Sequence, residues 1–278
     1  MDDALIRPIS DIVTLRRLEE LQQRIWAGPE REVVPAHQLL AAAAAGGVVL
    51  GAFAPGGDLV GFCYGFLGQR QGRPLFYSHM AGVIEEWRGR DVGFRLKQAQ
   101  RREALARGLA WMVWTFDPLQ STNAYFNLHR LGAEARRYYV DYYGEMPDEL
   151  NRGVESDRLE VDWFLRSPHV VRRMDSAARS EPTEESGDTA NAPVALAGSG
   201  EPLPRPVDSV LDLHVPEVRL GIPLDFTALR TTDLALAREW RAATRRAFQT
   251  YFGRGYAAVD FIRPPSLGYY VLRRTRAD

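Results

Sequence analysis

The stretch that most constrains the fold of this chain runs from Tyr77 to about Arg107. Side chains alternate over Tyr77–Val83 as in a strand, and from Val92 onward apolar residues recur at helical spacing. The turn between them is Arg88-Gly89-Arg90-Asp91-Val92-Gly93. A strand that enters a helix through such a turn presents unpaired N–H groups and arginine side chains together. The stretch therefore predicts an anion-binding junction in an α/β protein, although many such turns bind no ligand.

This turn resembles a loop of a known family. The run Arg88–Gly93 is similar to the acyl-CoA pyrophosphate loop of the GNAT N-acyltransferase superfamily, Arg/Gln-x-x-Gly-x-Gly/Ala. Val83 stands ahead of it as the family's strand valine does, whereas Asp91 takes the place of the family's first glycine. The resemblance covers roughly Leu5–Arg166. Within it, Met80–Trp163 is similar to a bacterial subfamily of predicted GNAT acetyltransferases.

The resemblance implies acetyl-CoA or another acyl-CoA as co-substrate and no metal. The diphosphate would lie on the amides of the loop, and the pantetheine arm would run beside the preceding strand and a later helix. The cofactor-binding residues that it implies are Val83, Ile84, Arg88, Gly89, Arg90, Asp91, Val92, Gly93 and Asn123.

Hydrophobic periodicity and turn residues predict the other elements. Before the junction they are a strand at Leu5–Ile9, a helix to about Trp26, a helix from Pro35, and strands at Val48–Phe53 and Leu59–Leu67. After it they are strands at Ala110–Phe116, Arg136–Tyr142, Leu159–Leu165, Glu217–Ile222, Ala257–Ile262 and Gly268–Arg273, with helices at Ser121–Leu131 and from Asp233 to Phe252. We expect an α/β (α+β) fold of the GNAT type. Its central sheet is mixed and mostly antiparallel, flanked by helices, with a C-terminal strand–helix–strand extension.

Composition suggests three regions. Residues 1–167 are predicted to form an acyl-CoA-binding domain, 168–206 a flexible linker and 207–278 a C-terminal α/β extension. From residue 175 to 206 the chain lacks aromatic residues and is rich in Ser, Gly, Pro and Ala, which is typical of a linker. The extension is small for a core of its own, so we expect it to pack on the first domain or on a second subunit.

Acyl transfer from a thioester to an amine requires a base that removes a proton from the ammonium group. His79 is the first candidate, because it shares a strand face with Val83 and its neutral form is available near pH 7. The alternative is a histidine satisfied inside the sheet. Glu85 and Glu86 are rivals at the end of the strand, where one of them more often faces solvent.

The departing thiolate requires an acid. In the resembled family a tyrosine four residues before a glycine has this role, and Gly132 stands at the position of that glycine. Leu128 occupies the place of the tyrosine. Tyr125, one turn earlier on nearly the same helix face, is the substitute candidate, and simple packing is its alternative role.

Three polar residues are candidates for binding the acceptor. Asp117 follows a predicted strand and either fixes a substrate ammonium or caps the next turn. Asn151 and Arg158 lie in a loop that the resemblance places over the acceptor site. Arg158 could hold a substrate carboxylate, whereas an internal ion pair between Asp157 and an arginine is the plainer interpretation.

The overall composition excludes several classes of function. The net charge of −1 over 278 residues gives no general attraction to nucleic acid or membranes. The single cysteine, Cys63, rules out a disulfide framework, and the histidines and this cysteine show no metal-ligand spacing. The start of the chain lacks a signal-peptide pattern, so we expect a cytoplasmic protein. Lys97 is the only lysine.

Two hypotheses remain. The first is an N-acyltransferase that transfers an acetyl or succinyl group directly, within a ternary complex, to the primary amine of a small molecule such as an amino acid. The second is a GNAT-type module that binds acyl-CoA, as a sensor or assembly part, and catalyses little. The second hypothesis is favoured by Asp91 and Leu128, and the first by Arg88, Gly89, Gly93 and His79. A homodimer stays open in both.

Overall fold

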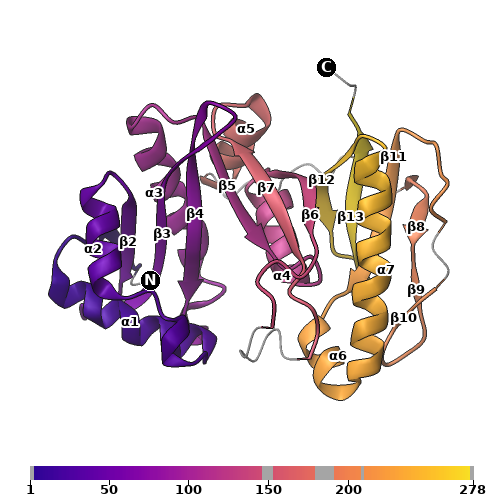
Figure 1. The fold of residues 1–278 in the computed structure, drawn as a ribbon, viewed down its shortest axis with the longest axis horizontal. Helices are drawn as coiled ribbons and strands as arrows, with labels where there is room; N and C mark the ends of the chain where they lie inside the picture. Colours follow the sequence, from indigo (N-terminus) through magenta and orange to yellow (C-terminus); the bar gives the residue numbers. More distant parts are fainter. Residues whose placement is uncertain (1–2, 146–152, 179–190, 208–209, 276–278) are drawn as a thin grey trace. The chain divides into compact units, whose positions relative to one another are not determined.

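The computed structural model describes residues 3–145, 153–178, 191–207 and 210–275. The chain divides into an N-terminal unit, Met1–Trp114, and a C-terminal unit, Thr115–Met146 with Asn151–Asp278. Figure 1 draws the first from indigo to magenta and the second from magenta to yellow.

The sheet of the N-terminal unit is built from consecutive strands. Their order is β1-β2-β3-β4-β5, antiparallel from β1 to β4, with β5 parallel to β4. The strands are β1 (Leu5–Pro8), β2 (Val48–Phe53), β3 (Leu59–Arg70), β4 (Arg73–Val83) and β5 (Trp111–Phe116), the last of which runs on into the second unit. The β4-to-β5 connection is a crossover through a helix, as parallel neighbours require.

Helices cover both faces of this sheet. They are α1 (Ile12–Trp26), α2 (Ala36–Ala44) and α3 (Val92–Ala106), with short 3-10 turns η1 (Glu30–Glu32) and η2 (Glu85–Trp87). Phe62 packs edge-on against Trp26 of α1, with ring centroids 5.7 Å apart, whereas the next residue, Cys63, contacts the backbone of Leu96 in α3. Neighbouring strand residues point to opposite faces, so α1 and α3 lie on opposite sides.

The C-terminal unit combines two distant parts of the sequence in one sheet of order β7-β6-β12-β13-β11-β8. Its strands are β6 (Glu134–Tyr139), β7 (Arg158–Phe164), β8 (Val194–Leu196), β11 (Glu217–Pro223), β12 (Tyr256–Ile262) and β13 (Leu267–Arg274); β9 (Gly198–Ser199) and β10 (Arg205–Pro206) form a separate pair. Neighbours are antiparallel except β8, which is parallel to β11. Ala258 of β12 pairs with Ala135 of β6. The C-terminal extension is therefore continuous with the strands that follow α4.

The helices of this unit are α4 (Ser121–Ala124), α5 (Pro168–Ala178), α6 (Phe226–Thr232) and the long α7 (Leu234–Gly253). A π-helical segment, η3 (Tyr125–Arg130), continues α4. The α7 helix packs on β6, β11 and β12, and buries Trp240 and Phe248 completely. Asp225 caps α6, and Asp233 caps α7 by accepting a hydrogen bond from the Leu236 amide.

The predicted fold class is confirmed: the structure is mixed α/β with mostly antiparallel strands in the predicted order. Three local predictions need correction. The helix predicted at 121–131 turns π-helical after Ala124, and α6 was not predicted. Within 168–206, α5 and β8 to β10 are folded, because apolar residues such as Val170 and Ala195 are buried there. Residues 179–190 lie outside the described part, and the division into three domains stays a prediction.

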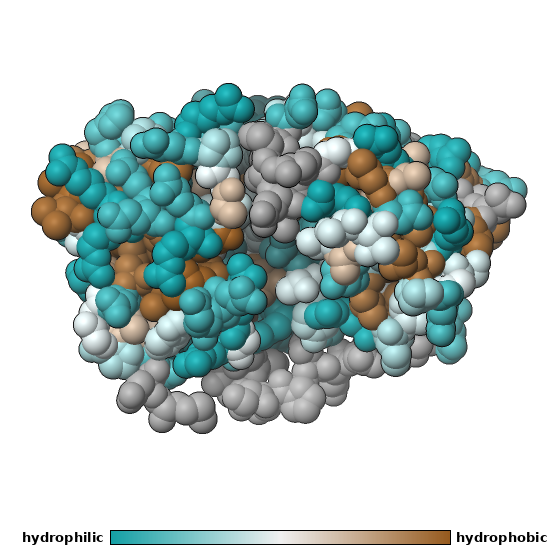
Figure 2. Space-filling model, turned by 90° about the horizontal axis from the view of Figure 1, so that it is seen from below, coloured by the Kyte–Doolittle hydropathy of each residue, from teal (hydrophilic) through white to brown (hydrophobic). Residues whose placement is uncertain are grey.

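The face shown in Figure 2 is largely hydrophilic, with smaller hydrophobic areas between the polar residues. Across the residues with described structure, none of the helices combines the length and the hydropathy that a membrane crossing needs.

Candidate active site

The strand-to-helix junction expected around Arg88–Gly93 is present in the N-terminal unit. Strand β4 ends at Val83, the η2 turn follows, and α3 begins at Val92. Gly89 and Asp91 both have left-handed backbone conformations, with φ of 74° and 57°. A left-handed conformation is easy for glycine and tolerable for aspartate, and it turns the chain sharply into the helix.

Backbone amides at the start of α3 are candidates for binding an anion. In the part of the chain with described structure, the amides of Gly89, Arg90, Val92 and Gly93 donate to no protein acceptor, and no side chain caps the helix. These amides lie at the positive end of the helix dipole. The exposed side chains of Arg88 and Arg90 flank the same loop. Such a site suits a diphosphate.

Other backbone groups that the resemblance assigned to cofactor binding already form hydrogen bonds within the protein. The Ile84 amide donates to the Val60 carbonyl at 3.0 Å, and the Arg88 amide donates to the Glu85 carbonyl at 3.0 Å. The Arg88 side chain also donates to the Val83 carbonyl at 3.2 Å. The available cradle is therefore narrower than the predicted one, and lies between Gly89 and Gly93.

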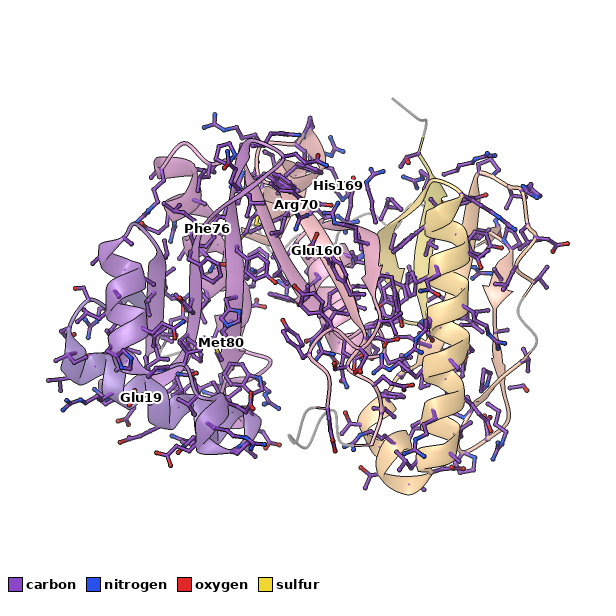
Figure 3. The ribbon with its side chains drawn as sticks, viewed as in Figure 1. Glu19, Arg70, Phe76, Met80, Glu160 and His169 are labelled. Carbon is purple, nitrogen blue, oxygen red and sulfur yellow. The ribbon has the colours of Figure 1, made fainter. Side chains whose placement is uncertain are left out.

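His79 occupies a β-bulge in β4. Gly65 of β3 pairs with Ser78, but its neighbour Tyr64 pairs with Met80, so His79 is the extra residue. A bulge of this kind redirects a side chain. Figure 3 labels Phe76 and Met80 on either side of this segment. The His79 side chain is exposed, and packing around it desolvates the imidazole and lowers its pKa, which favours the neutral form that a base requires.

A buried polar triangle lies behind this strand. Lys97 of α3 donates to Ser78 Oγ at 2.8 Å and to Gln100 Oε1 at 3.2 Å, and Ser78 Oγ bonds Gln100 Oε1 at 2.8 Å. The Lys97 ammonium is 3.6 Å from the centroid of the Trp114 ring. Burial lowers the pKa of Lys97 to about 7. The triangle links the helix of the anion loop to the residue before His79, a contact that the sequence analysis missed.

The rival carboxylates lie in the η2 turn. Glu85 and Glu86 are exposed, and Glu86 is 3.6 Å from Arg24 of α1. An exposed ion pair of this kind contributes little to stability. Neither residue has a buried environment that would prepare it for proton transfer, which leaves His79 as the better-placed base.

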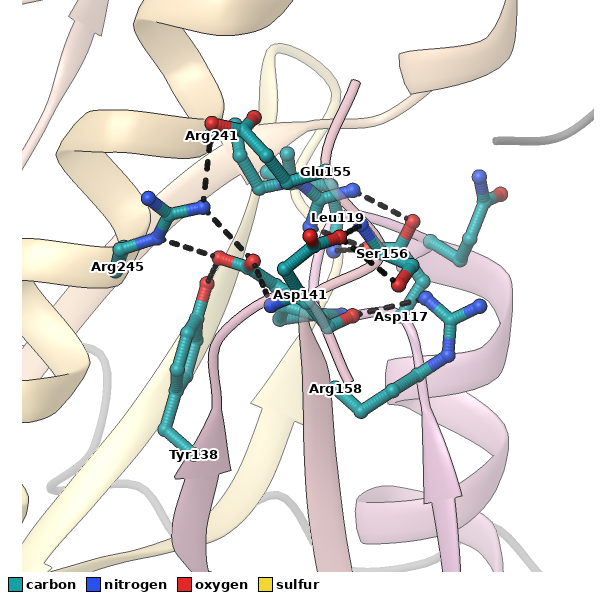
Figure 4. A network of polar contacts seen from close by, with 12 residues as sticks. Asp117, Leu119, Tyr138, Asp141, Glu155, Ser156, Arg158, Arg241 and Arg245 are labelled. Atoms are coloured by element: carbon teal, nitrogen blue, oxygen red, sulfur yellow. Dashed lines mark hydrogen bonds and ion pairs between the residues drawn. The ribbon is translucent and has the colours of Figure 1, made fainter. Parts of the chain in front are cut away.

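In the C-terminal unit, Asp117 is part of a buried ion pair (Figure 4). Its two carboxylate oxygens accept hydrogen bonds from the Arg241 guanidinium of α7, both at 2.8 Å. Oδ1 also accepts from the Leu119 amide at 2.9 Å, which is the predicted turn-capping contact. Burial opposes ionisation of Asp117, but Arg241 outweighs it and the pKa is lowered. The carboxylate is therefore engaged within the protein.

A second ion pair lies beside the first. Asp157, fully buried, accepts two hydrogen bonds from Arg245 at 2.8 Å each and one from the Tyr138 hydroxyl at 2.6 Å. The internal pairing expected for Asp157 is thus present, with Arg245 as the partner. Arg158 donates to the Asp157 carbonyl at 2.9 Å and lies 5.2 Å from the Tyr143 ring centroid. Arg158 is only 7% exposed.

The acid candidate Tyr125 is stacked. Its ring lies 4.7 Å from that of His129, which in turn bonds Asp260 at 2.8 Å. This geometry agrees with the packing alternative for Tyr125. Leu128 is completely buried and carries no proton to donate. The link between His129 and Asp260 joins residues far apart in the sequence, and no local pattern could have predicted it.

The remaining predicted residues differ in where the structure places them. Asn123 is exposed on α4, and Asn151 lies outside the described residues. Cys63 is buried, and burial raises the pKa of its thiol to about 12, which makes it a poor nucleophile. Within the described ranges, His, Cys, Asp and Glu form no cluster that could hold a metal ion.

Comparison with known proteins gives distant structural likenesses. No family model and no curated protein matches the sequence. Solved structures similar to the chain include a GNAT-family acetyltransferase of Streptococcus pneumoniae (15% identity, 58% of this chain and 98% of that one, TM-score 0.46). They also include the yncA acetyltransferase of Salmonella typhimurium with its cofactor acetyl-CoA (17%, 59% and 95%, TM-score 0.45). A third is aminoglycoside 6′-acetyltransferase type Ii (17%, 59% and 98%, TM-score 0.46). Likenesses this distant decide neither the family nor the activity of the chain.

Proposed function

We propose that the chain is an acyl-CoA-dependent N-acyltransferase of the GNAT type. It transfers an acetyl or succinyl group to the primary amine of a small molecule, including amino acids, in a ternary complex, and it works in the cytoplasm, where acyl-CoA is found. The resemblance of Arg88–Gly93 to a pyrophosphate loop motivates the proposal. The element order around the loop agrees with it.

The single observation that carries the proposal is the uncapped start of α3. Amides of Gly89, Arg90, Val92 and Gly93 are uncommitted among the described residues, and two exposed arginines lie beside them. Helix N-termini bind phosphate through their free N–H groups and the helix dipole. A CoA diphosphate fits this chemistry, although the Asp91 carboxylate in the same loop opposes it.

The reaction assigns a role to His79. The neutral imidazole takes a proton from the substrate ammonium, and the freed amine attacks the thioester carbonyl. The C–S bond then breaks and CoA leaves as a thiolate, while the attacking nitrogen loses its second proton as the amide forms; one of the two ammonium protons goes to the thiolate and the other is released to solvent. His79 returns the first ammonium proton to the thiolate, so the reaction balances without a separate acid.

A CoA-release assay tests the proposal. Purified protein is incubated with acetyl-CoA or succinyl-CoA and a panel of amino acids and amines, and free thiol is measured. Amine-dependent release with formation of the N-acyl product is the expected result. The absence of both release and any CoA-induced rise in melting temperature would overturn the proposal.

Two observations favour a second function, an acyl-CoA-binding module without turnover. Asp91 brings negative charge to the anion loop, and buried Leu128 stands where the resembled family has its acid. In that case CoA raises the melting temperature, but no amine releases thiol. The same assay therefore separates the two functions.

A further inference from the structure

Four rings gather on one face of the β3–β4 hairpin. We call Tyr64, Phe66, Tyr77 and His79 the aromatic cluster. Phe66 and Tyr77 are stacked, with centroids 5.4 Å apart and planes at 19°. His79 lies 5.9 Å from Tyr64, 6.0 Å from Phe66 and 6.4 Å from Tyr77. The candidate base is therefore surrounded by aromatic side chains from both strands.

The bulge explains how these rings meet. At Gly65, an added Cβ would overlap the Phe76 ring and lie 2.6 Å from the Tyr77 carbonyl, so a larger residue would displace the strand pairing. Glycine here lets β3 approach β4 closely where the register shifts. His79 lies on the same face of β4 as Tyr77, which comes two residues earlier, and Tyr64 and Phe66 of β3 meet it there. The shift puts His79 on the face opposite Val83, which faces α3, so the shared strand face expected for these two residues is wrong.

The cluster is anchored on one side and open on the other. Tyr64 is 2% exposed, whereas Phe66 is 37% exposed and His79 is also exposed. Leu67, the next residue along β3, is 47% exposed but points to the other face of the sheet. Ring faces attract both apolar groups and ammonium ions, so a partly exposed ring beside a candidate base can contact an amine substrate.

We propose that the aromatic cluster is the acceptor subsite, and that the acceptor is a primary amine with an aromatic or bulky apolar group close to its nitrogen. This inference rests on the proposed function. For His79 to take its proton, the ammonium nitrogen must come within hydrogen-bond reach of the imidazole. The substituent next to that nitrogen then lies against Phe66 and Tyr77, whose stacked pair offers a further ring a face to pack on.

Matched amines and matched variants test this inference. Rates of acyl transfer are compared for 2-phenylethylamine and ethylamine, and for phenylalanine and alanine, with wild type, Phe66→Ala and the control Leu67→Ala. The wild type should prefer the ring-bearing amine by about tenfold in kcat/KM. Phe66→Ala should reduce this preference about threefold to tenfold, and Leu67→Ala should leave it unchanged. Both positions are partly exposed, so both variants should fold.

A binding measurement separates failure of the subsite from failure of the proposed function. The same amines are titrated by calorimetry into protein saturated with CoA. Ring-dependent binding that Phe66→Ala removes and Leu67→Ala keeps supports the subsite, even when no amine is acylated. Equal binding and equal rates for both members of each amine pair, or equal losses in the two variants, overturn it.

Discussion

Arginine is used in opposite ways in the two units. In the N-terminal unit, Arg88 and Arg90 are exposed beside a helix start whose amides are uncommitted among the described residues. In the C-terminal unit, Arg241 and Arg245 form two-pronged hydrogen bonds to Asp117 and Asp157. Both regions contain residues that the sequence marked as ligand-binding. Among the described residues, the first keeps exposed arginines and uncommitted amides, whereas in the second the carboxylates of Asp117 and Asp157 are paired.

The difference has an energetic reason. A buried charge loses its hydration and must recover that free energy from a close partner, so a buried pair is structural unless something displaces it. An exposed arginine keeps its hydration and can exchange water for phosphate at small cost. The comparison predicts that changes in the C-terminal network alter stability, and that changes around the β4–α3 loop alter binding and catalysis.

The largest effect is expected from Arg241→Ala. This change leaves the buried Asp117 carboxylate without its partner, and should lower the free energy of unfolding by about 3–5 kcal/mol. Urea denaturation measures it. Arg238→Ala, on an exposed part of the same helix, is the matched control and should cost less than about 1 kcal/mol. The double variant Asp117→Leu with Arg241→Met should recover most of the loss. A loss equal to the control's would show that the pair is not structural.

His79→Ala should lower turnover and leave stability unchanged. We expect kcat to fall about 100-fold, because a positioned base contributes at least that factor, while CoA affinity and melting temperature stay near wild type. The acidic limb of the wild-type kcat/KM profile should lie below pH 6.5, since the pKa of His79 is lowered, and it should vanish in the variant. Unchanged turnover would remove His79 from the mechanism.

Gly93→Asp tests the anion cradle. A carboxylate in the first turn of α3 occupies the place of the diphosphate and repels it, so CoA affinity should fall about 30-fold. Calorimetric titration with CoA measures this. Gly93→Ala is the control, because an added Cβ meets only Val83 Cγ2 at 4.0 Å and should leave CoA affinity close to wild type. Equal affinities in both variants would place the CoA elsewhere.

Lys97 should make stability depend on pH. Its amine loses a proton near pH 7 in the folded protein but near pH 10.5 when unfolded. Between these values the unfolded chain holds more protons, so stability rises with pH. Raising the pH from 6 to 9 should therefore increase the free energy of unfolding of the wild type, measured relative to that of Lys97→Met, by about 2–3 kcal/mol. A pH-independent difference between the two would contradict this.

The smallest effect is expected from Asp91→Gly. Glycine adopts the left-handed conformation of this position, with φ of 57°, at no steric cost, and it removes a negative charge from the loop. CoA should bind about fivefold more tightly. Asp91→Asn removes the charge alone and should give part of the gain. Weaker CoA binding in both variants would mean that the Asp91 carboxylate contributes to the site.

Much of the N-terminal unit could be predicted from its sequence. The β2 bounds Val48–Phe53 and the start of α3 at Val92 were both predicted, because strand alternation, helical spacing and turn residues are local signals. The bulge at His79 was not predicted, since a shift in register depends on which residues of β3 lie opposite. For the same reason the aromatic cluster became visible only in the structure.

The sequence by itself determined the order of the strands and helices from β1 to β5 and the chemistry of the turn from Arg88 to Gly93, because both depend on residues close together in the chain. Only the tertiary structure decided which charged side chains are already paired within the protein. Asp117 and Arg241 are 124 residues apart, and nothing local marks either as the partner of the other. Pairing at that distance follows from how β-strands and α7 pack, and it converts a candidate ligand-binding carboxylate into part of the core.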